Sequence, residues 1–332
     1  MKRSEWPIYV KIDRRNMLVG LGAVLAVPAL PVTSFANTGG LRIVATTGMI
    51  ADTTRQILGD LGEVVGLMGP GIDPHAYRQT RTDILAMARA DIVLWNGLYL
   101  EAQMEDFLHD LERKTPVVAV AEAVAIEDRV AHDDYADRFD PHVWMDPVLW
   151  QSVVGSVRDA LISIAPEHEA TFTENAAVFT KQVEEIGAYA TEILATVPED
   201  ARVLVTAHDA FNYFGRAYGF DVVGIQGIST ESEAGISRIS SLVDMIVERE
   251  IGAVFVESSV SDRSIRALIE GAAAKGHDLK IGGELFSDAM GSPGTYEGTY
   301  LGMIDHNATV IASALGGVAP ERGFAGKLSA GS

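Results

Sequence analysis

The sequence predicts an α/β protein with two similar lobes, each built on a four-stranded, mainly parallel sheet flanked by helices, and one long helix that bridges the lobes. From Leu41 onward, short runs rich in β-branched residues alternate with amphipathic stretches, which is the pattern of parallel strands joined by helices. The expected strands form two groups of four, one on each side of the stretch 166–198. With 332 residues, of which 48% are hydrophobic, the chain is long enough to bury a core in each lobe.

Residues 1–36 are expected to be an export signal peptide that is removed from the mature protein. Five basic residues up to Arg15 precede an apolar stretch from Met17 to Leu30, and Ser34-Phe35-Ala36 offers a small-x-small cleavage site. The pair Arg14-Arg15 and the glycines that interrupt the apolar stretch favour twin-arginine export, with an ordinary Sec signal as the alternative. A membrane anchor is disfavoured because the uninterrupted apolar run is short for a span. The mature protein is therefore expected in the periplasm.

The charge and the absence of cysteine exclude several kinds of protein. A net charge of −20 disfavours nucleic-acid binding, because neutralising phosphates requires clustered Lys and Arg. The chain contains no cysteine, so it forms no disulfide, carries no lipid on an N-terminal cysteine and offers no thiolate ligand. Any bound metal must be held by nitrogen and oxygen atoms.

The two lobes are expected to span residues 41–165 and 199–318. In the first lobe, strands are predicted at about 42–45, 63–67, 91–95 and 117–120. In the second lobe, they are predicted at about 202–206, 221–225, 253–257 and 279–283. This similarity of pattern suggests two lobes of one design.

The stretch 166–198 is expected to form the linking helix. Apolar residues from Phe172 to Leu194 recur at roughly helical intervals, and no proline interrupts them. At about 1.5 Å per residue, a helix of this length spans roughly 45 Å, enough to run along both lobes. Such a connector is stiff, so the lobes are expected to move little relative to each other. Two shorter helices broken near Gly187 are the alternative.

Three histidines and one aspartate lie just beyond predicted strand ends. His75 follows the second strand, His142 the fourth, His208 the fifth and Asp288 the last. Ligands of open α/β sheets bind beyond the carboxyl ends of the strands, and two of these residues come from each lobe. One metal ion between the lobes is therefore a hypothesis. The opposing interpretation is that these are surface histidines, because the chain has no compact His-x-x-x-His motif.

Two of the candidate histidines end the same tripeptide, Asp-Pro-His, at 73–75 and 140–142. Proline fixes its own φ and restricts the residue before it, which helps to hold each imidazole in one orientation. Of the other histidines, His132 lies in the acidic loop 127–140. That loop is expected to be a solvated face, with transient capture of metal by His132 as the alternative. The remaining four are expected to be solvated or to pack locally: His109, His168, His277 and His306.

Five longer motifs contain these candidate residues or lie next to them. They are Gly71-Ile-Asp-Pro-His-Ala-Tyr77, Asp140-Pro-His-Val-Trp-Met-Asp-Pro147, Thr206-Ala-His-Asp-Ala-Phe-Asn-Tyr-Phe-Gly215, Phe255-Val-Glu-Ser-Ser259 and Gly282-Gly-Glu-Leu-Phe-Ser-Asp-Ala-Met290. These motifs are long and ordered, and they resemble those of the TroA-like periplasmic solute-binding proteins of zinc/manganese ABC transporters. The resemblance covers about Leu41 to Leu315. It implies a metal site made of His75, His142, His208 and Asp288, between two lobes bridged by a long helix.

The donor set favours a divalent first-row metal. Three imidazoles count against Ca²⁺ and Mg²⁺, which prefer oxygen, and raw affinity favours Zn²⁺ over Mn²⁺. Within the family, manganese or iron binders often carry a glutamate where this chain has His208, and zinc importers commonly have a histidine-rich loop where this chain has only His132. We therefore expect one ion of Mn²⁺ or Zn²⁺, with Fe²⁺ as an alternative.

Several side chains are expected around the metal. Glu257 ends a strand at the edge of the crevice, where it could accept a hydrogen bond from a ligating imidazole or pair with an arginine instead. Four aromatic residues flank the ligands and either exclude water from the site or belong simply to the core: Trp144, Phe211, Tyr213 and Phe286.

The resemblance implies an exported, non-enzymatic protein that delivers its metal to the membrane permease of an ABC transporter. The chain has no phosphate-binding loop and no bundle of membrane helices, so the permease and the ATPase must be separate subunits. A monomer is expected. One alternative is a zinc hydrolase in which three histidines leave a position open for an activated water. Another is a metal-stabilised adhesin or structural protein.

Overall fold

The computed structural model describes residues 40–132 and 138–329. The expected signal peptide, 1–36, lies outside the described residues. The strands are β1 (Leu41–Ala45), β2 (Gly62–Gly66), β3 (Ile92–Trp95), β4 (Val117–Ala119), β5 (Val203–Thr206), β6 (Asp221–Gly224), β7 (Ala253–Glu257) and β8 (Lys280–Leu285). The helices are α1 (Gly48–Leu58), α2 (Arg81–Met87), α3 (Glu105–Leu111), α4 (Pro147–Ile164), α5 (Glu169–Leu194), α6 (Asn212–Tyr218), α7 (Ile236–Glu248), α8 (Arg263–Ala274) and α9 (Tyr300–Ala314).

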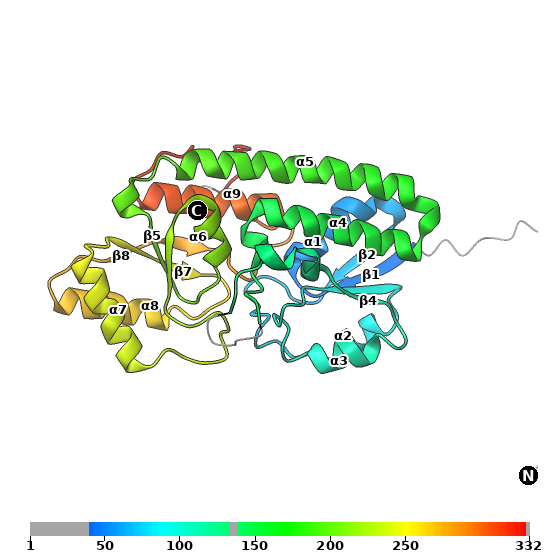
Figure 1. Ribbon diagram of the computed structural model, residues 1–332, viewed down its shortest axis with the longest axis horizontal. Coiled ribbons are helices and arrows are strands. Elements are labelled where there is room, and N and C mark those ends of the chain that lie inside the picture. The colour runs from blue at the N-terminus through cyan, green and yellow to red at the C-terminus, as the bar shows by residue number, and fades with distance from the viewer. Residues whose placement is uncertain (1–39, 133–137, 330–332) are drawn as a thin grey trace, which may run out of the picture. The chain divides into compact units, whose positions relative to one another are not determined.

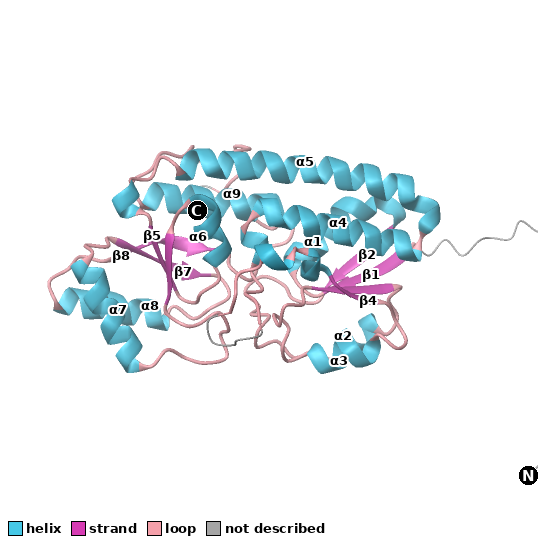
Figure 2. Ribbon diagram, viewed as in Figure 1, coloured by secondary structure: helices cyan, strands magenta, loops and turns pink. Residues whose placement is uncertain are grey.

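The N-terminal lobe is built on the parallel sheet β2-β1-β3-β4. The two central strands are buried on both faces over the apolar stretches from Ile43 to Ala45 and from Ile92 to Trp95, whereas Arg42 near the start of β1 is exposed. Along β1, Ile43 and Ala45 pack into one apolar cluster and Val44 into another. Figure 2 shows α1 and α4 on one face of this sheet and α2 and α3 on the other. The predicted four-stranded sheet of this lobe is confirmed.

The C-terminal lobe also has four strands, but they form two hydrogen-bonded pairs. β5 pairs with β6 and β7 with β8, both in parallel, and β5 and β7 lie side by side. The expected four strands and their parallel direction are found in this lobe, but β5 and β7 are not joined by backbone hydrogen bonds into one continuous sheet. Beyond the end of β5, a side chain joins the two pairs: Glu257 of β7 accepts the backbone N–H of His208 at 2.8 Å.

The long linking helix is confirmed as one piece. α5 is continuous over 26 residues and follows a short 3₁₀ turn at Pro166–His168. The alternative of a break near Gly187 is wrong. A Cβ atom at Gly187 would lie 3.1 Å from the Pro147 ring, so glycine here allows α5 to approach the start of α4 closely. In Figure 1, α5 runs along both lobes, and it contacts α1, α4 and α9.

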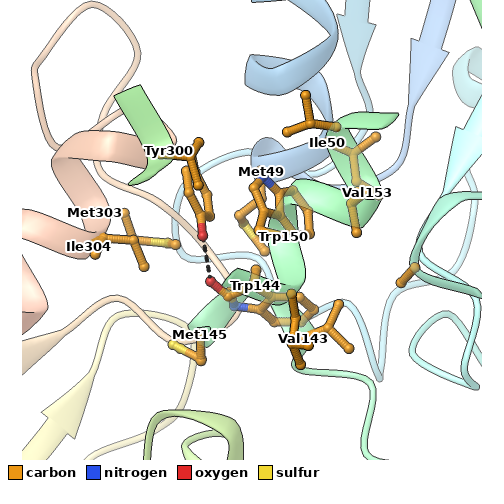
Figure 3. Packing of buried hydrophobic residues seen from close by; sticks show 14 of the residues in the cluster. Met49, Ile50, Val143, Trp144, Met145, Trp150, Val153, Tyr300, Met303 and Ile304 are labelled. Carbon is orange, nitrogen blue, oxygen red and sulfur yellow. Dashed lines mark hydrogen bonds between the residues drawn. The ribbon is translucent and has the colours of Figure 1, made fainter. Parts of the chain in front are cut away.

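The largest apolar cluster extends through both lobes. It contains Ile43 of β1, Ile186 of α5 and Leu204 of β5, whereas the outer face of each sheet has a separate, smaller cluster. Two residues beyond His142, the Trp144 carbonyl accepts the Tyr300 hydroxyl at 3.0 Å, and the rings of Trp150 and Tyr300 stack at 5.1 Å (Figure 3). Because close-packed interiors resist deformation, this shared core supports the prediction of small lobe movements.

None of the helices in the described ranges combines the length and the apolar character needed to cross a membrane. The lobe boundaries at 165, 198 and 318 stay a prediction.

Candidate metal centre

The structure brings the side chains of His75, His142, His208 and Asp288 together. Their potential ligand atoms all lie within 4.8 Å of one another. The Nε2 atoms of His75 and His142 are 3.2 Å apart, and Asp288 Oδ2 lies 3.2 Å from Nε2 of His208 and 3.7 Å from that of His75. The other Asp288 oxygen lies 3.3 Å from Nε2 of His142. Four loops from two lobes therefore converge on one point.

These distances fit a bound divalent metal. Atoms placed tetrahedrally at about 2.0–2.2 Å from a metal lie about 3.3–3.6 Å from each other, close to the observed separations. The side chains are at most 2% exposed, and Nε2 of His208 and both oxygens of Asp288 have no hydrogen-bond partner. Buried polar atoms without partners are costly, and a shared cation would satisfy all of them. The donor set is therefore suited to hold an ion.

His75 is held by its own tripeptide. It lies in the loop between β2 and α2, and its backbone N–H donates to Asp73 Oδ1 at 2.9 Å. Burial lowers the pKa of His75 to about 3, since Asp288 offsets only part of the cost of charging it and the other two histidines oppose its protonation. The imidazole is neutral at physiological pH and ready to ligate.

His142 ends the second copy of the tripeptide. Its backbone N–H donates to Asp140 Oδ1 at 2.9 Å, and its ring Nδ1 donates to the same oxygen at 2.6 Å. This bond leaves Nε2 directed at the other ligands. Burial acts to lower the pKa of His142, but the carboxylates of Asp140 and Asp288 outweigh it and raise the pKa to about 9. The His142 ring also packs edge-on against Trp144 at 5.1 Å.

His208 follows β5 and is tied to β7. Its backbone N–H and ring Nδ1 donate to the two oxygens of Glu257. Burial acts to lower the pKa of His208, but the charges of Glu257 and Asp288 outweigh it and raise the pKa well above its ordinary value. Glu257 is thus placed as expected for a carboxylate that orients a ligating imidazole, and that role stays a proposal.

Asp288 lies in the short loop after β8. The loop is fixed by Asn307 of α9, which accepts the Phe286 N–H at 2.9 Å and donates to the Phe286 carbonyl at 2.7 Å. Trp144 Nε1 donates to the Ser287 carbonyl at 2.8 Å, which links the His142 loop to the Asp288 loop. Burial acts to raise the pKa of Asp288, but the interactions with His208 and His142 outweigh it. The net result is a pKa well below the ordinary value of an aspartate.

The other sequence-based candidates lie outside this cluster. His132 is 6% exposed, and its backbone N–H donates to the Arg138 carbonyl. Its role in transient metal capture stays a prediction, because Asp133, Asp134 and Asp137 of the acidic loop lie outside the described residues. Of the four histidines set aside, His109 is exposed beside Glu105, whereas His306 is buried and bonded to the Glu284 carbonyl.

The aromatic candidates belong to the large core. Trp144, Phe211 and Tyr213 are fully buried, and Phe286 is partly buried against the same cluster. Tyr213 also joins the lobes, because its hydroxyl donates to the Asp140 carbonyl at 2.9 Å and accepts the Val130 N–H at 3.0 Å. Of the four, Trp144 contacts a candidate ligand, His142, and all four pack in or against the core.

Three residues that contact the loops of the candidate ligands are not among the sequence-based candidates. In the sequence, Asp140 belongs to the acidic loop 127–140, although its position two residues before a histidine allows a carboxylate–imidazole contact. Asn307 and Thr230 contact ligand loops from distant elements, and nothing in their local sequence indicates this.

Comparison with known proteins places the chain among metal-binding proteins in sequence and fold. The family model described as zinc-uptake complex component A, periplasmic (ZnuA) matches residues 43–314. The chain is 45% identical over 275 residues to the manganese-binding lipoprotein MntA of Bacillus subtilis (strain 168), covering 83% of this chain and 90% of the relative. It is 26% identical over 288 residues to the manganese ABC transporter substrate-binding lipoprotein PsaA of Streptococcus pneumoniae, covering 85% and 91%.

A solved structure agrees with these matches. The periplasmic zinc-binding protein TroA of Treponema pallidum superposes with a TM-score of 0.81 at 43% identity, covering 83% of this chain and 99% of TroA. The resemblance inferred from the five motifs is confirmed, as is the α/β architecture with its long helix. With a family match over most of its length and relatives above 40% identity, this chain belongs to the zinc-uptake complex component A (ZnuA) family of periplasmic proteins.

Proposed function

We propose that this protein is the exported solute-binding component of an ABC transporter and captures one divalent transition metal between its lobes. The observation that carries the proposal is the meeting of four buried ligand atoms from His75, His142, His208 and Asp288. Two of the ligands come from each lobe, so the ion bridges the lobes. Relatives that are named manganese-binding, zinc-binding and ABC transporter substrate-binding proteins support it.

The cargo we propose is Mn²⁺ or Zn²⁺, with Fe²⁺ as the alternative. Three imidazoles and one carboxylate supply four donors, or five if Asp288 binds through both oxygens, and each first-row ion accepts such a set. Among the relatives, MntA is named for manganese and TroA for zinc. Both share more than 40% of their residues with this chain, so similarity alone does not select the ion.

The proposed role is non-enzymatic. In a hydrolytic zinc site, three protein ligands leave one position open for water. Here Asp288 reaches the same point as the three histidines, and every ligand side chain is at most 2% exposed. The closed site supports capture over catalysis. Metal-dependent hydrolysis of esters or peptides by the purified protein would contradict this role.

The proposed partners are a membrane permease and its separate ATPase, which would receive the ion after export. We further propose that residues 1–36 are a cleaved signal of the twin-arginine type, that the mature lobes span 41–165 and 199–318, and that the protein acts as a monomer without nucleic acid. Replacing Arg14 and Arg15 by lysine should block export of the folded protein. Continued export would favour the Sec alternative.

The direct test is elemental analysis of the protein purified from its native periplasm, followed by competitive titration with Zn²⁺ and Mn²⁺. One ion per chain is expected. His208→Ala should lose far more affinity than either His132→Ala or the exposed control His109→Ala. Equal losses in the three variants would show that His208 is not a ligand.

A further inference from the structure

The metal ligands are closed off on two different sides by two different kinds of contact. On one side, Trp144, Trp150 and Tyr300 pack tightly in the core that the lobes share (Figure 3). On another, the segment 226–235, which joins β6 to α7, reaches the N-terminal lobe through polar side chains. Figure 1 shows the chain that enters α7 running toward that lobe.

The central contact of the segment 226–235 is made by Thr230. Its hydroxyl donates to Asp73 Oδ2 at 2.6 Å, across 157 positions of sequence. The other oxygen, Asp73 Oδ1, accepts the backbone N–H of His75 at 2.9 Å. One carboxylate therefore holds the ligand loop of one lobe and the segment of the other at the same time.

A second contact lies beside the first but is more exposed. Gln103, next to α3, donates to Glu231 of the same segment. Glu231 is exposed, whereas Thr230 is half-buried and Ile228 is only 2% exposed. Hydrogen bonds shielded from water contribute more than exposed ones, so Thr230 is the stronger of the two contacts.

An ion held at this site cannot leave while the closed arrangement persists, because its ligands are at most 2% exposed. Opening the site on the side of Trp144, Trp150 and Tyr300 would require the close-packed core that the lobes share to come apart. On the polar side, opening breaks the hydrogen bonds that Thr230 and Gln103 make across the lobes. Breaking the Thr230 hydrogen bond also frees Asp73, the carboxylate that holds the backbone of His75. The His75 loop and the segment 226–235 therefore loosen together.

Building on the proposed function, we propose that Thr230 is a positioning residue that holds the site closed through Asp73 and thereby sets the rate at which the metal leaves. Thr230 touches no ligand atom. Its hydroxyl acts through Asp73 on the His75 loop. Removing the hydroxyl should raise the dissociation rate of the ion about fivefold to tenfold, the usual effect of one hydrogen bond shielded from water. Association should change less, because the contact forms only as the segment 226–235 closes over the bound ion.

The experiment compares Thr230→Val, which removes only the hydroxyl, with Thr230→Ser, which retains it. Thr173→Val on the exposed face of α5 is the matched control. Each protein is loaded with Zn²⁺ and mixed with a chromophoric chelator at several concentrations, so that the rate at saturating chelator reports dissociation. Faster release from Thr230→Val, with Thr230→Ser and Thr173→Val close to wild type, is the expected result.

Three results would overturn the inference. Release from Thr230→Val at the wild-type rate would show that the hydroxyl does not hold the site closed. Equal acceleration in Thr230→Ser would assign the effect to packing. A large loss of melting temperature in metal-free Thr230→Val would make Thr230 a general structural residue. Failure of the wild-type protein to bind Zn²⁺ or Mn²⁺ would instead contradict the proposed function, independently of any Thr230 variant.

Discussion

The two Asp-Pro-His tripeptides have the same local structure and opposite electrostatics. In both copies, the aspartate Oδ1 accepts the backbone N–H of the histidine at 2.9 Å. In the second copy the same oxygen also accepts from the ring of His142, and the pKa of that histidine is raised to about 9. In the first copy, burial dominates and lowers the pKa of His75 to about 3. The tripeptide sequence therefore determines the local hydrogen bond to the histidine backbone. Burial and neighbouring carboxylates determine whether the histidine is charged.

The difference extends to the contacts between the lobes. Asp140 accepts from Asn212 of α6 at 3.0 Å, deep beside Tyr213, whereas Asp73 accepts from Thr230 on the more exposed segment 226–235. Asp140 is fully buried, and Asp73 is not. His142 thus belongs to the rigid side of the site, and His75 to the side that we propose opens.

The largest effect is expected from removing a ligand. His142→Ala should reduce metal affinity by more than the roughly 10- to 100-fold typical of changes outside the ligand set, because one of four donors is lost. Equilibrium competition with a chelator of known affinity measures this. Retention of near wild-type affinity, with His109→Ala as the control, would remove His142 from the site.

The next prediction compares the two aspartates directly. Asp140→Asn should cost about 10- to 100-fold in affinity, because it removes the charge that orients and activates the ring of His142. Asp73→Asn should cost less than about tenfold, because an asparagine oxygen still accepts the His75 N–H and no ring contact is lost. The same competition assay measures both variants. Equal losses would show that the tripeptides have equivalent roles after all.

Proton release on metal binding should also distinguish the two Asp-Pro-His tripeptides. His142, with a pKa raised to about 9, is protonated in the metal-free protein at pH 7.5 and must release its proton when an ion binds, and the raised pKa of His208 favours release from that ring as well. His75, with a pKa of about 3, releases none. Affinity should therefore rise between pH 6.5 and about 9. Calorimetry in buffers of different ionisation enthalpy counts the protons, and no release would contradict the charge assignment.

The same shifts predict the stability of the metal-free protein. A folded pKa of about 9 for His142, above its ordinary value of 6.5, contributes stability that is fully present below pH 6.5 and is lost as pH rises through 9. His75 has the opposite sign: its low folded pKa costs stability as pH falls from 6.5 toward 3. Urea unfolding of the metal-free protein across this range should show both trends. Unchanged stability between pH 7 and 10 would argue against a protonated His142.

The smallest effect is expected from chelation. Because the apolar clusters contain none of the four candidate ligands, metal removal should lower the melting temperature by several degrees and leave the far-UV circular dichroism unchanged. Unfolding on chelation would support a metal-stabilised structural protein instead of a carrier. A matched melt of His142→Ala, with and without Zn²⁺, should show little shift.

The sequence predicted much of the fold because the signals were local. All eight strands and the continuous α5 follow from apolar runs and helical spacing. The convergence of His75, His142, His208 and Asp288 followed from the rule that ligands gather beyond strand ends, strengthened by family motifs. The role of those residues as ligands stays a proposal that the geometry supports.

What the sequence did not predict depends on contacts between distant residues. Thr230 and Asp73 are 157 positions apart, and their pairing depends on how the two lobes meet. The opposite pKa shifts of His75 and His142 arise from burial and neighbouring charges that identical tripeptides do not encode. The amino-acid composition of the strands likewise does not predict that the C-terminal sheet divides into the pairs β5-β6 and β7-β8.

The most direct test of the site is a crystal structure of the Zn²⁺- or Mn²⁺-loaded protein with anomalous scattering recorded at the metal edge. We predict one strong peak about 2.0–2.2 Å from Nε2 of His75, His142 and His208 and from the carboxylate of Asp288. No peak at this point, or a stronger peak beside His132 and the acidic loop, would contradict the assignment.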